Sequence, residues 1–181
     1  MNHMVRTSIR LVFLFCFLAC SDRNNTIEKP KSVPSEAEIR EGLLERNRRL
    51  LAEEMELIRS FVDRRGWKMD TTTTGLYYSV LKPGNGNAAR LLDRVSVRYT
   101  LGLLDGTTCY SSDSTGNLEL IIGQSDEPSG LQEGLLRMKE GEEAMLIVPS
   151  YLAFGVSGDG VCIPPGSSII YQLTLEKIRE Q

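Results

Sequence analysis

Few side chains in this sequence could serve as acid, base or nucleophile at neutral pH. The only histidine is His3, which lies in an N-terminal segment that we expect to be removed. Without an imidazole, the mature chain lacks the means for Ser-His-Asp or Cys-His catalysis and for histidine-containing zinc sites. The sequence therefore favours a binding site, or a reaction that needs no acid–base group.

The N-terminus carries the pattern of an export signal. Arg6 and Arg10 precede an apolar run over residues 11–19, and the run stops at Cys20. We predict a signal peptide at 1–19, because this run is too short to span a bilayer as a helix. The segment Phe17-Leu18-Ala19-Cys20 resembles a bacterial lipobox, which would make Cys20 the lipidated first residue of the mature chain. An ordinary cleaved signal peptide is the alternative.

The remaining cysteines indicate the compartment of the protein, and its net charge indicates which partners it can bind. Cys16 would leave with the signal peptide, so Cys109 and Cys162 would face an oxidising compartment. Removal of Arg6 and Arg10 takes the formal net charge from −3 to −5. Because the mature chain is acidic, we expect no nucleic-acid partner. From the export signal and the lipobox-like segment, we expect a lipid-anchored protein of the bacterial cell envelope that faces the periplasm.

A tether and a long helix should follow the signal peptide. Residues 20–34 are polar and contain prolines, which predicts a flexible lipid-anchored tether. Ser35 and Glu38 form a capping box that begins a charged amphipathic helix over residues 35–66. One face of this helix is apolar (Leu44, Leu51, Met55, Ile58, Val62). Two explanations stay open: the face docks on the following domain or acts as a stalk, or it forms a homodimer.

The rest of the chain changes to the pattern of strands. We predict strands at 76–82, 95–99, 118–122, 144–148 and 168–177, a hairpin turn at Asp105-Gly106, and one short helix at 131–138 between Gly130 and Gly141. Several strands with one short helix predict an α+β domain over residues 75–181, with an antiparallel β-sheet wrapped around a short central helix.

Six segments, in order along this domain, resemble FKBP-type peptidyl-prolyl isomerases. They are Leu81-Lys82-Pro83-Gly84-Asn85-Gly86, Val97-Arg98-Tyr99-Thr100, Leu104-Asp105-Gly106-Thr107, Gly134-Leu135-Leu136-Arg137-Met138-Lys139-Glu140-Gly141-Glu142, Val148-Pro149-Ser150-Tyr151-Leu152-Ala153-Phe154-Gly155 and Ile163-Pro164-Pro165-Gly166-Ser167. With its signal peptide and charged helix, the chain is similar to the FKBP-like lipoproteins associated with gliding motility. The resemblance implies an FKBP-like fold, X-Pro-containing exported polypeptides as substrates, and no metal or cofactor.

The resemblance also implies which residues form the site. Tyr99, Phe154, Ile163 and Tyr171 would be catalytic. Leu118, Leu120, Leu131, Cys109 and Tyr110 would bind the substrate. For each of them, ordinary core packing is the alternative interpretation.

Several positions depart from the family pattern. Phe154 stands where the family usually has a tyrosine, Leu131 replaces a tryptophan, and Cys109-Tyr110 replaces a Phe-Asp pair. Pro128 lacks the backbone N–H that would meet a ligand there. Within the family frame, Cys109 and Cys162 would form a disulfide across the rim of the pocket, with two free thiols as the alternative.

Two functions remain after these observations. The first is a prolyl isomerase of the cell envelope, which accelerates X-Pro isomerisation during the folding of exported proteins by desolvation in an apolar cleft. The second is a catalytically weak FKBP-like chaperone or assembly module in an envelope complex. Activity on short X-Pro peptides would distinguish them.

Overall fold

The computed structural model describes residues 34–179. The expected signal peptide, the lipidation site at Cys20 and nearly all of the tether lie outside the described residues. Of the described residues, 42–179 belong to one compact unit and 34–41 to another. Among the described residues, no helix combines the length and the apolar character that crossing a membrane requires.

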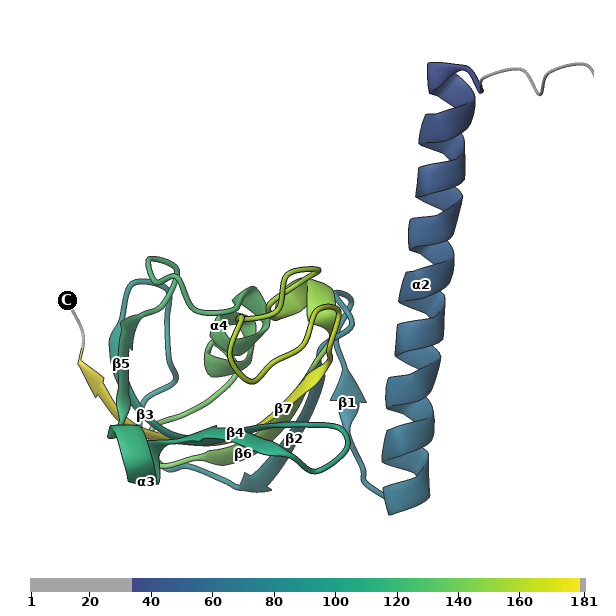
Figure 1. Cartoon of the computed structure of the whole chain (residues 1–181). Helices are drawn as coiled ribbons and strands as arrows, with labels where there is room; N and C mark the ends of the chain where they lie inside the picture. Colours follow the sequence, from purple (N-terminus) through teal and green to yellow (C-terminus); the bar gives the residue numbers. More distant parts are fainter. Residues whose placement is uncertain (1–33, 180–181) are drawn as a thin grey trace, which may run out of the picture. The chain divides into compact units, whose positions relative to one another are not determined.

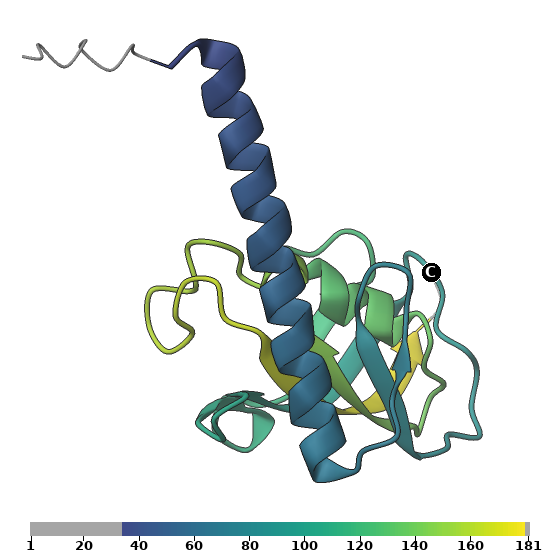
Figure 2. The same cartoon turned by 90° about the vertical axis from the view of Figure 1, so that its right-hand side faces the viewer.

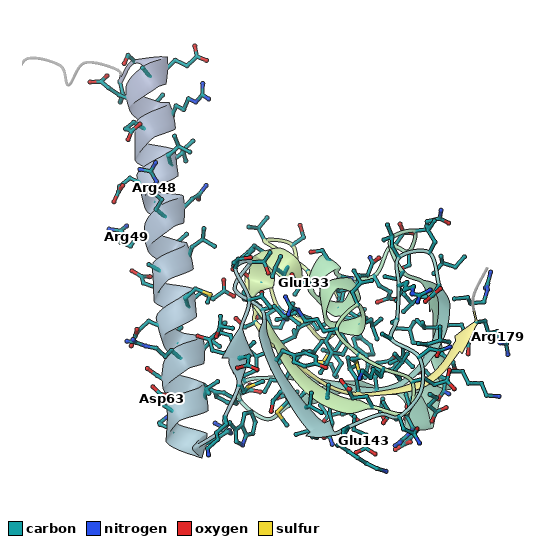
Figure 3. The ribbon with its side chains drawn as sticks, turned by 180° about the vertical axis from the view of Figure 1, so that it is seen from behind. Arg48, Arg49, Asp63, Glu133, Glu143 and Arg179 are labelled. Carbon is teal, nitrogen blue, oxygen red and sulfur yellow. A yellow bond between two sulfur atoms is a disulfide. The ribbon has the colours of Figure 1, made fainter. Side chains whose placement is uncertain are left out.

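The long helix, α2, runs from Glu36 to Arg65 and confirms the predicted N-terminal helix. It begins with a reciprocal capping box: the Ser35 N–H donates to Glu38 Oε2 at 2.7 Å, and the Glu38 N–H donates to Ser35 Oγ at 3.3 Å. It ends at Gly66, whose positive φ of 63° is the conformation that commonly closes a helix. Arg48 and Arg49, which extend from the helix in Figure 3, form ion pairs with Glu45 and Glu53, respectively.

The domain is built on an antiparallel sheet, as predicted. Its strands are β1 (Asp70–Thr71), β2 (Tyr77–Lys82), β3 (Arg94–Leu103), β4 (Thr108–Ser111), β5 (Leu118–Ile121), β6 (Glu143–Val148) and β7 (Ile169–Arg179). Their order is β1-β2-β6-β7-β3-β4, and β5 also pairs with β3. Figure 1 shows this sheet curving around the short helix α4 (Ser129–Leu135). The other helices within residues 34–179 are α3 (Ser112–Thr115) and the 3-10 turn η1 (Ser150–Leu152).

Strand alternation divides the apolar side chains between the two faces of the sheet. On β6, Leu146 and Val148 belong to the main core beneath α4, whereas Ile147 belongs to a second cluster on the other face. On β2, Tyr78 faces the main core and Tyr77 faces the second cluster. The sheet is therefore covered on both faces.

The C-terminal half of α2 supplies the cover for the second face (Figure 2). Ile58, Phe61 and Val62 are buried there, with Trp67 packed edge-on against Phe61 at 5.5 Å between ring centroids. Leu44 and Leu51 of the same predicted apolar face each remain 43% exposed. The face thus docks on the domain only over its last turns.

Helix α4 begins and ends earlier than the sequence predicted. The expected range was 131–138 with Gly130 as its boundary, but the helix spans Ser129–Leu135 and Gly130 lies inside it. Pro128 caps the helix from the position before it, because its carbonyl accepts from the N–H groups of Leu131 and Gln132. The glycines allow close packing: a Cβ on Gly134 would lie 2.4 Å from a Leu146 methyl carbon of β6.

Candidate functional site

A cavity of about 280 Å³ opens on the α4 side of the sheet, between β3, β4, β5, the segment before α4 and the loop after η1. Its lining residues come from six segments of the chain: Tyr99, Leu101, Tyr110, Leu118, Glu127, Phe154, Asp159 and Tyr171. We call this cavity the ring pocket. Five of these residues were named from the sequence as site residues, so the fold brings them together around one open space.

Sheet register explains how the two tyrosines of the central strands meet. Leu101 of β3 pairs with Tyr171 of β7, and Tyr99 lies two residues before Leu101, so all three point to the same face. The rings of Tyr99 and Tyr171 lie 6.3 Å apart between centroids and are tilted by 56°. Tyr171 is 2% exposed and forms the floor, while Tyr99 is partly exposed at the wall.

The edge strand β4 forms the opposite wall. Tyr110 of β4 pairs with Leu101 of β3, which places its ring over the same face. The preceding residue, Cys109, is joined by a disulfide to Cys162, with Cα atoms 5.7 Å apart. This bond ties the long loop before β7, yellow-green in Figure 1, to the rim of the ring pocket.

Asp159 orders that loop from within. Its Oδ1 accepts three backbone N–H groups, from Val161 at 2.9 Å, Cys162 at 3.0 Å and Ile163 at 2.8 Å. Its Oδ2 accepts the hydroxyl of Tyr110. The Tyr110 hydrogen bond, followed by the backbone N–H groups, lowers the pKa of Asp159 to about 2. The carboxylate is therefore ionised throughout the neutral range.

Glu127 brings a second carboxylate to the ring pocket, from the residue before Pro128. Burial, with a smaller contribution from Asp126, raises the pKa of Glu127. Burial, followed by the nearby charge of Glu127 and by Tyr99, raises the pKa of Tyr171. Glu127 thus lies close enough to Tyr171, the floor of the ring pocket, for its charge to raise the pKa of that tyrosine.

Of the other residues named from the sequence, Cys109 is partly buried at the rim and three lie deeper. Leu120, Leu131 and Ile163 are at most 4% exposed and belong to the main core, against which Tyr99, Tyr110 and Phe154 pack. They support the walls of the ring pocket without lining it. Ile163 nevertheless belongs to the rim loop, because its N–H binds Asp159.

Three lining residues were missed from the sequence: Leu101, Glu127 and Asp159. Leu101 could have been found, since it lies two residues from Tyr99 on one strand and must share its face. Asp159 lies in a glycine-rich loop, 49 residues from its partner Tyr110, so no local pattern connects the two.

The ring pocket suits a small apolar ring with a polar chain on either side. Its lining combines four aromatic rings with two leucines, and its polar groups are the hydroxyls of Tyr99, Tyr110 and Tyr171 and the two carboxylates. Pockets that are largely apolar with a few placed polar groups are typical of ligand sites.

Comparisons with known proteins agree with this geometry. The model of the FKBP-type peptidyl-prolyl cis-trans isomerase family matches residues 86–176. The chain is 36% identical over 108 residues to the probable FKBP-type peptidyl-prolyl cis-trans isomerase FkpA of Neisseria meningitidis, covering 60% of this chain and 39% of that protein. It is 35% identical over 107 residues to the FK506-binding protein of the same organism, covering 59% of this chain and 98% of that protein.

A solved structure extends the likeness to three dimensions. The crystal structure of FkpA from Escherichia coli aligns with a TM-score of 0.60 at 27% identity, covering 82% of this chain and 75% of that one. The matched region spans only 39% to 53% of the length of three bacterial relatives, the Neisseria FkpA, the 22 kDa isomerase of Escherichia coli and Mip of Coxiella burnetii. The family match, the fold and the convergence of side chains at the ring pocket point the same way: this chain belongs to the FKBP-type peptidyl-prolyl cis-trans isomerase family.

Proposed function

We propose that this protein is a peptidyl-prolyl cis-trans isomerase and that the ring pocket binds the proline of an X-Pro segment. The observation that supports this most is the convergence of Tyr99, Phe154 and Tyr171 on one open, mainly apolar cavity. Tyr110 and Leu118 complete its walls.

The proposed mechanism needs no proton transfer. Rotation about an X-Pro bond meets a barrier of roughly 18–20 kcal/mol, because amide resonance is lost midway. The twisted amide has less charge separation than the planar one. An apolar pocket that excludes water therefore destabilises the planar amide more than the twisted amide of the transition state. The pocket thus binds the transition state more tightly than the ground state.

The test is the isomerisation rate of a short Leu-Pro peptide. Phe154→Leu removes an aromatic wall and should lower kcat/KM about tenfold, which corresponds to ~1.4 kcal/mol of transition-state stabilisation. Trp67→Leu is the matched control, because Trp67 packs with the second cluster on the other face of the sheet. No acceleration by the wild-type protein, or equal loss in both variants, would reject the ring pocket as the active site.

We place the protein in the bacterial cell envelope, held by lipid at Cys20, as an aid to the folding of exported X-Pro-containing polypeptides. The signal-like segment at 1–19 and the disulfide of the domain support this proposal, since disulfides persist in oxidising compartments. Metabolic labelling with palmitate tests it. A Cys20→Ala protein that takes up as much label as the wild type would contradict the lipid anchor.

We also propose that residues 35–66 mediate a homodimer. The leucines Leu43, Leu50 and Leu57 follow one another at seven-residue intervals on α2 and are each at least half exposed, which suits a helix–helix contact. Mass measurement by light scattering should show a dimer for the wild type and a monomer for Leu50→Glu. A monomeric wild type would refute this.

A groove beside α2 favours the second candidate, a catalytically weak chaperone module. It has a volume of about 760 Å³ and a mostly apolar lining that includes Leu51, Leu104 and Val156. Such a groove suits an apolar segment of an unfolded polypeptide. The candidate predicts that the protein suppresses aggregation of an unfolded client without accelerating the peptide, and that Val156→Glu abolishes this protection.

A further inference from the structure

Two carboxylates of this chain face the proposed proline pocket from different segments. Glu127 comes from the turn before α4, and Asp159 comes from the loop after η1. Both line the same cavity as Tyr99 and Phe154. The inference that follows rests on the proposed function and concerns the residue next to the substrate proline.

No cation neutralises either carboxylate within residues 34–179. The six ion pairs in this part of the chain involve neither Glu127 nor Asp159. Asp159 is satisfied by three N–H groups and the Tyr110 hydroxyl, which fix it in place and leave its charge uncompensated. The side chain of Glu127 takes part in no hydrogen bond in the described part of the chain, so its oxygens are free to accept.

The floor of the ring pocket carries a further polar group without a partner. Tyr171 is 98% buried, since it is only 2% exposed, and its hydroxyl makes no hydrogen bond within the described residues. No fully buried side-chain oxygen in the described residues lacks a partner, so the Tyr171 hydroxyl reaches the open space of the ring pocket, where a ligand or water can bond it. This hydroxyl is independent of the two carboxylates and is placed to form a hydrogen bond with a polar atom of a ligand in the ring pocket.

We propose that the ring pocket selects X-Pro segments in which the residue next to the proline is lysine or arginine, with Glu127 as the residue that contacts the cation. A long basic side chain can lay its methylene stem on apolar walls while its charged end reaches a carboxylate. Leu118 and Phe154 supply the walls, and Glu127 supplies the carboxylate. Asp159 adds negative potential of the same sign, which disfavours aspartate or glutamate beside the proline.

The preference for a basic residue should be modest in size, because Glu127 and Asp159 are both partly exposed to solvent. A single contact of this kind changes an equilibrium by a factor of about three, and repulsion of an acidic residue adds a similar factor. The kcat/KM for a Lys-Pro peptide should therefore exceed that for the matched Glu-Pro peptide about tenfold at low salt. The ratio should shrink toward one at about 1 M NaCl, where the screening length is near 3 Å.

The experiment compares Lys-Pro, Leu-Pro and Glu-Pro peptides of otherwise identical sequence in a protease-free NMR exchange assay. Glu127→Gln keeps the shape of the side chain and removes its charge, and should lower the Lys-to-Glu ratio about threefold or more. Glu119→Gln is the matched control, because Glu119 is an exposed residue of β5 and does not line the pocket. Its ratio should equal that of the wild type.

The outcomes separate this inference from the proposed function. Turnover of all three peptides at equal rates, or a ratio unchanged in Glu127→Gln, would overturn the basic preference while the isomerase activity stands. If no peptide is turned over, the isomerase proposal fails. The dissociation constants from NMR titration of the same peptides then decide the preference: tighter binding of Lys-Pro that weakens in Glu127→Gln supports it, and equal binding refutes it.

Discussion

Opening the disulfide between Cys109 and Cys162 should cost this domain a large part of its stability. The bond closes a segment with a sequence separation of 53 residues, which contains α3, β5, α4 and β6. In the chain-entropy description, closing a loop of this length lowers the entropy of the unfolded chain enough to stabilise the fold by about 4 kcal/mol. A domain of this size has roughly 5–15 kcal/mol in total.

The measurement is guanidinium denaturation with and without a reductant, followed by circular dichroism for the sheet. Fluorescence of Trp67, the only tryptophan, follows the second cluster in parallel. Intact mass should rise by about two daltons on reduction, and the free energy of unfolding should fall by about 4 kcal/mol. The control is a protein with both Cys109→Ser and Cys162→Ser, which should be as stable as the reduced wild type and indifferent to reductant. A reduced protein that keeps the midpoint of the oxidised one would refute the entropic reasoning.

Three further substitutions test how the fold holds the site. Glu54→Ala on α2 removes hydrogen bonds to Ser150 and Ser168, the two ends of the segment between β6 and β7, and should lower the free energy of unfolding by ~2–3 kcal/mol in a urea titration. The control Glu53→Ala, at an exposed position of the same helix, should change the free energy of unfolding by less than about 0.5 kcal/mol. Asp159→Asn removes a carboxylate whose pKa lies at about 2, below its ordinary 3.8. Its stabilisation is therefore complete above pH 4 and lost as the pH falls through 2, so thermal midpoints of variant and wild type should differ constantly from pH 5 to 8 and converge near pH 2. Gly134→Ala should destabilise by ~1–3 kcal/mol in chemical denaturation because its Cβ would lie 2.4 Å from a side chain of β6, while Gly42→Ala on the open surface of α2 should not destabilise.

Glu54 of α2 joins the two ends of the segment from Ser150 to Ser168, which lies between β6 and β7. Its Oε1 accepts from the Ser150 N–H at 2.6 Å and from Ser168 Oγ at 2.5 Å, and its Oε2 accepts from Ser150 Oγ at 2.9 Å. Ser150 begins η1 before Phe154, and Ser168 immediately precedes β7 and its Tyr171. One carboxylate of the helix thus holds both ends of the segment that carries a pocket wall and the rim.

The sequence alone predicted the sheet because its strands alternate between two environments. Val95 and Val97 on β3 are buried and face the main core, as their spacing of two requires. The predicted boundaries of α4 are wrong because Gly130, which as a glycine favours a helix end, lies inside this helix. Gly130 and Gly134 are instead kept small by β6 and η1, a tertiary constraint that local propensity does not contain.

The site was less accessible to sequence reasoning than the fold. Five of the nine positions taken from the family pattern line the ring pocket, and register within the shared sheet explains why Tyr99, Tyr110 and Tyr171 face it. Glu127 and Asp159 had no counterpart in that pattern and no local signal. Asp159 reaches the pocket because Gly158 and Gly160 adopt positive φ, and a Cβ on Gly158 would lie 2.1 Å from the Ile163 carbonyl oxygen.

The departures from the family pattern compensate one another in space. The sequence lacks a carboxylate at Tyr110 and a hydroxyl at Phe154. The structure supplies a carboxylate from Asp159, which accepts a hydrogen bond from the Tyr110 hydroxyl, and a hydroxyl from Tyr171 on the floor of the ring pocket. The same kinds of polar atom therefore surround the pocket, donated from different strands and loops. Judging such a site residue by residue along the sequence underestimates it, because the chemistry depends on which atoms share a cavity and not on which positions supply them.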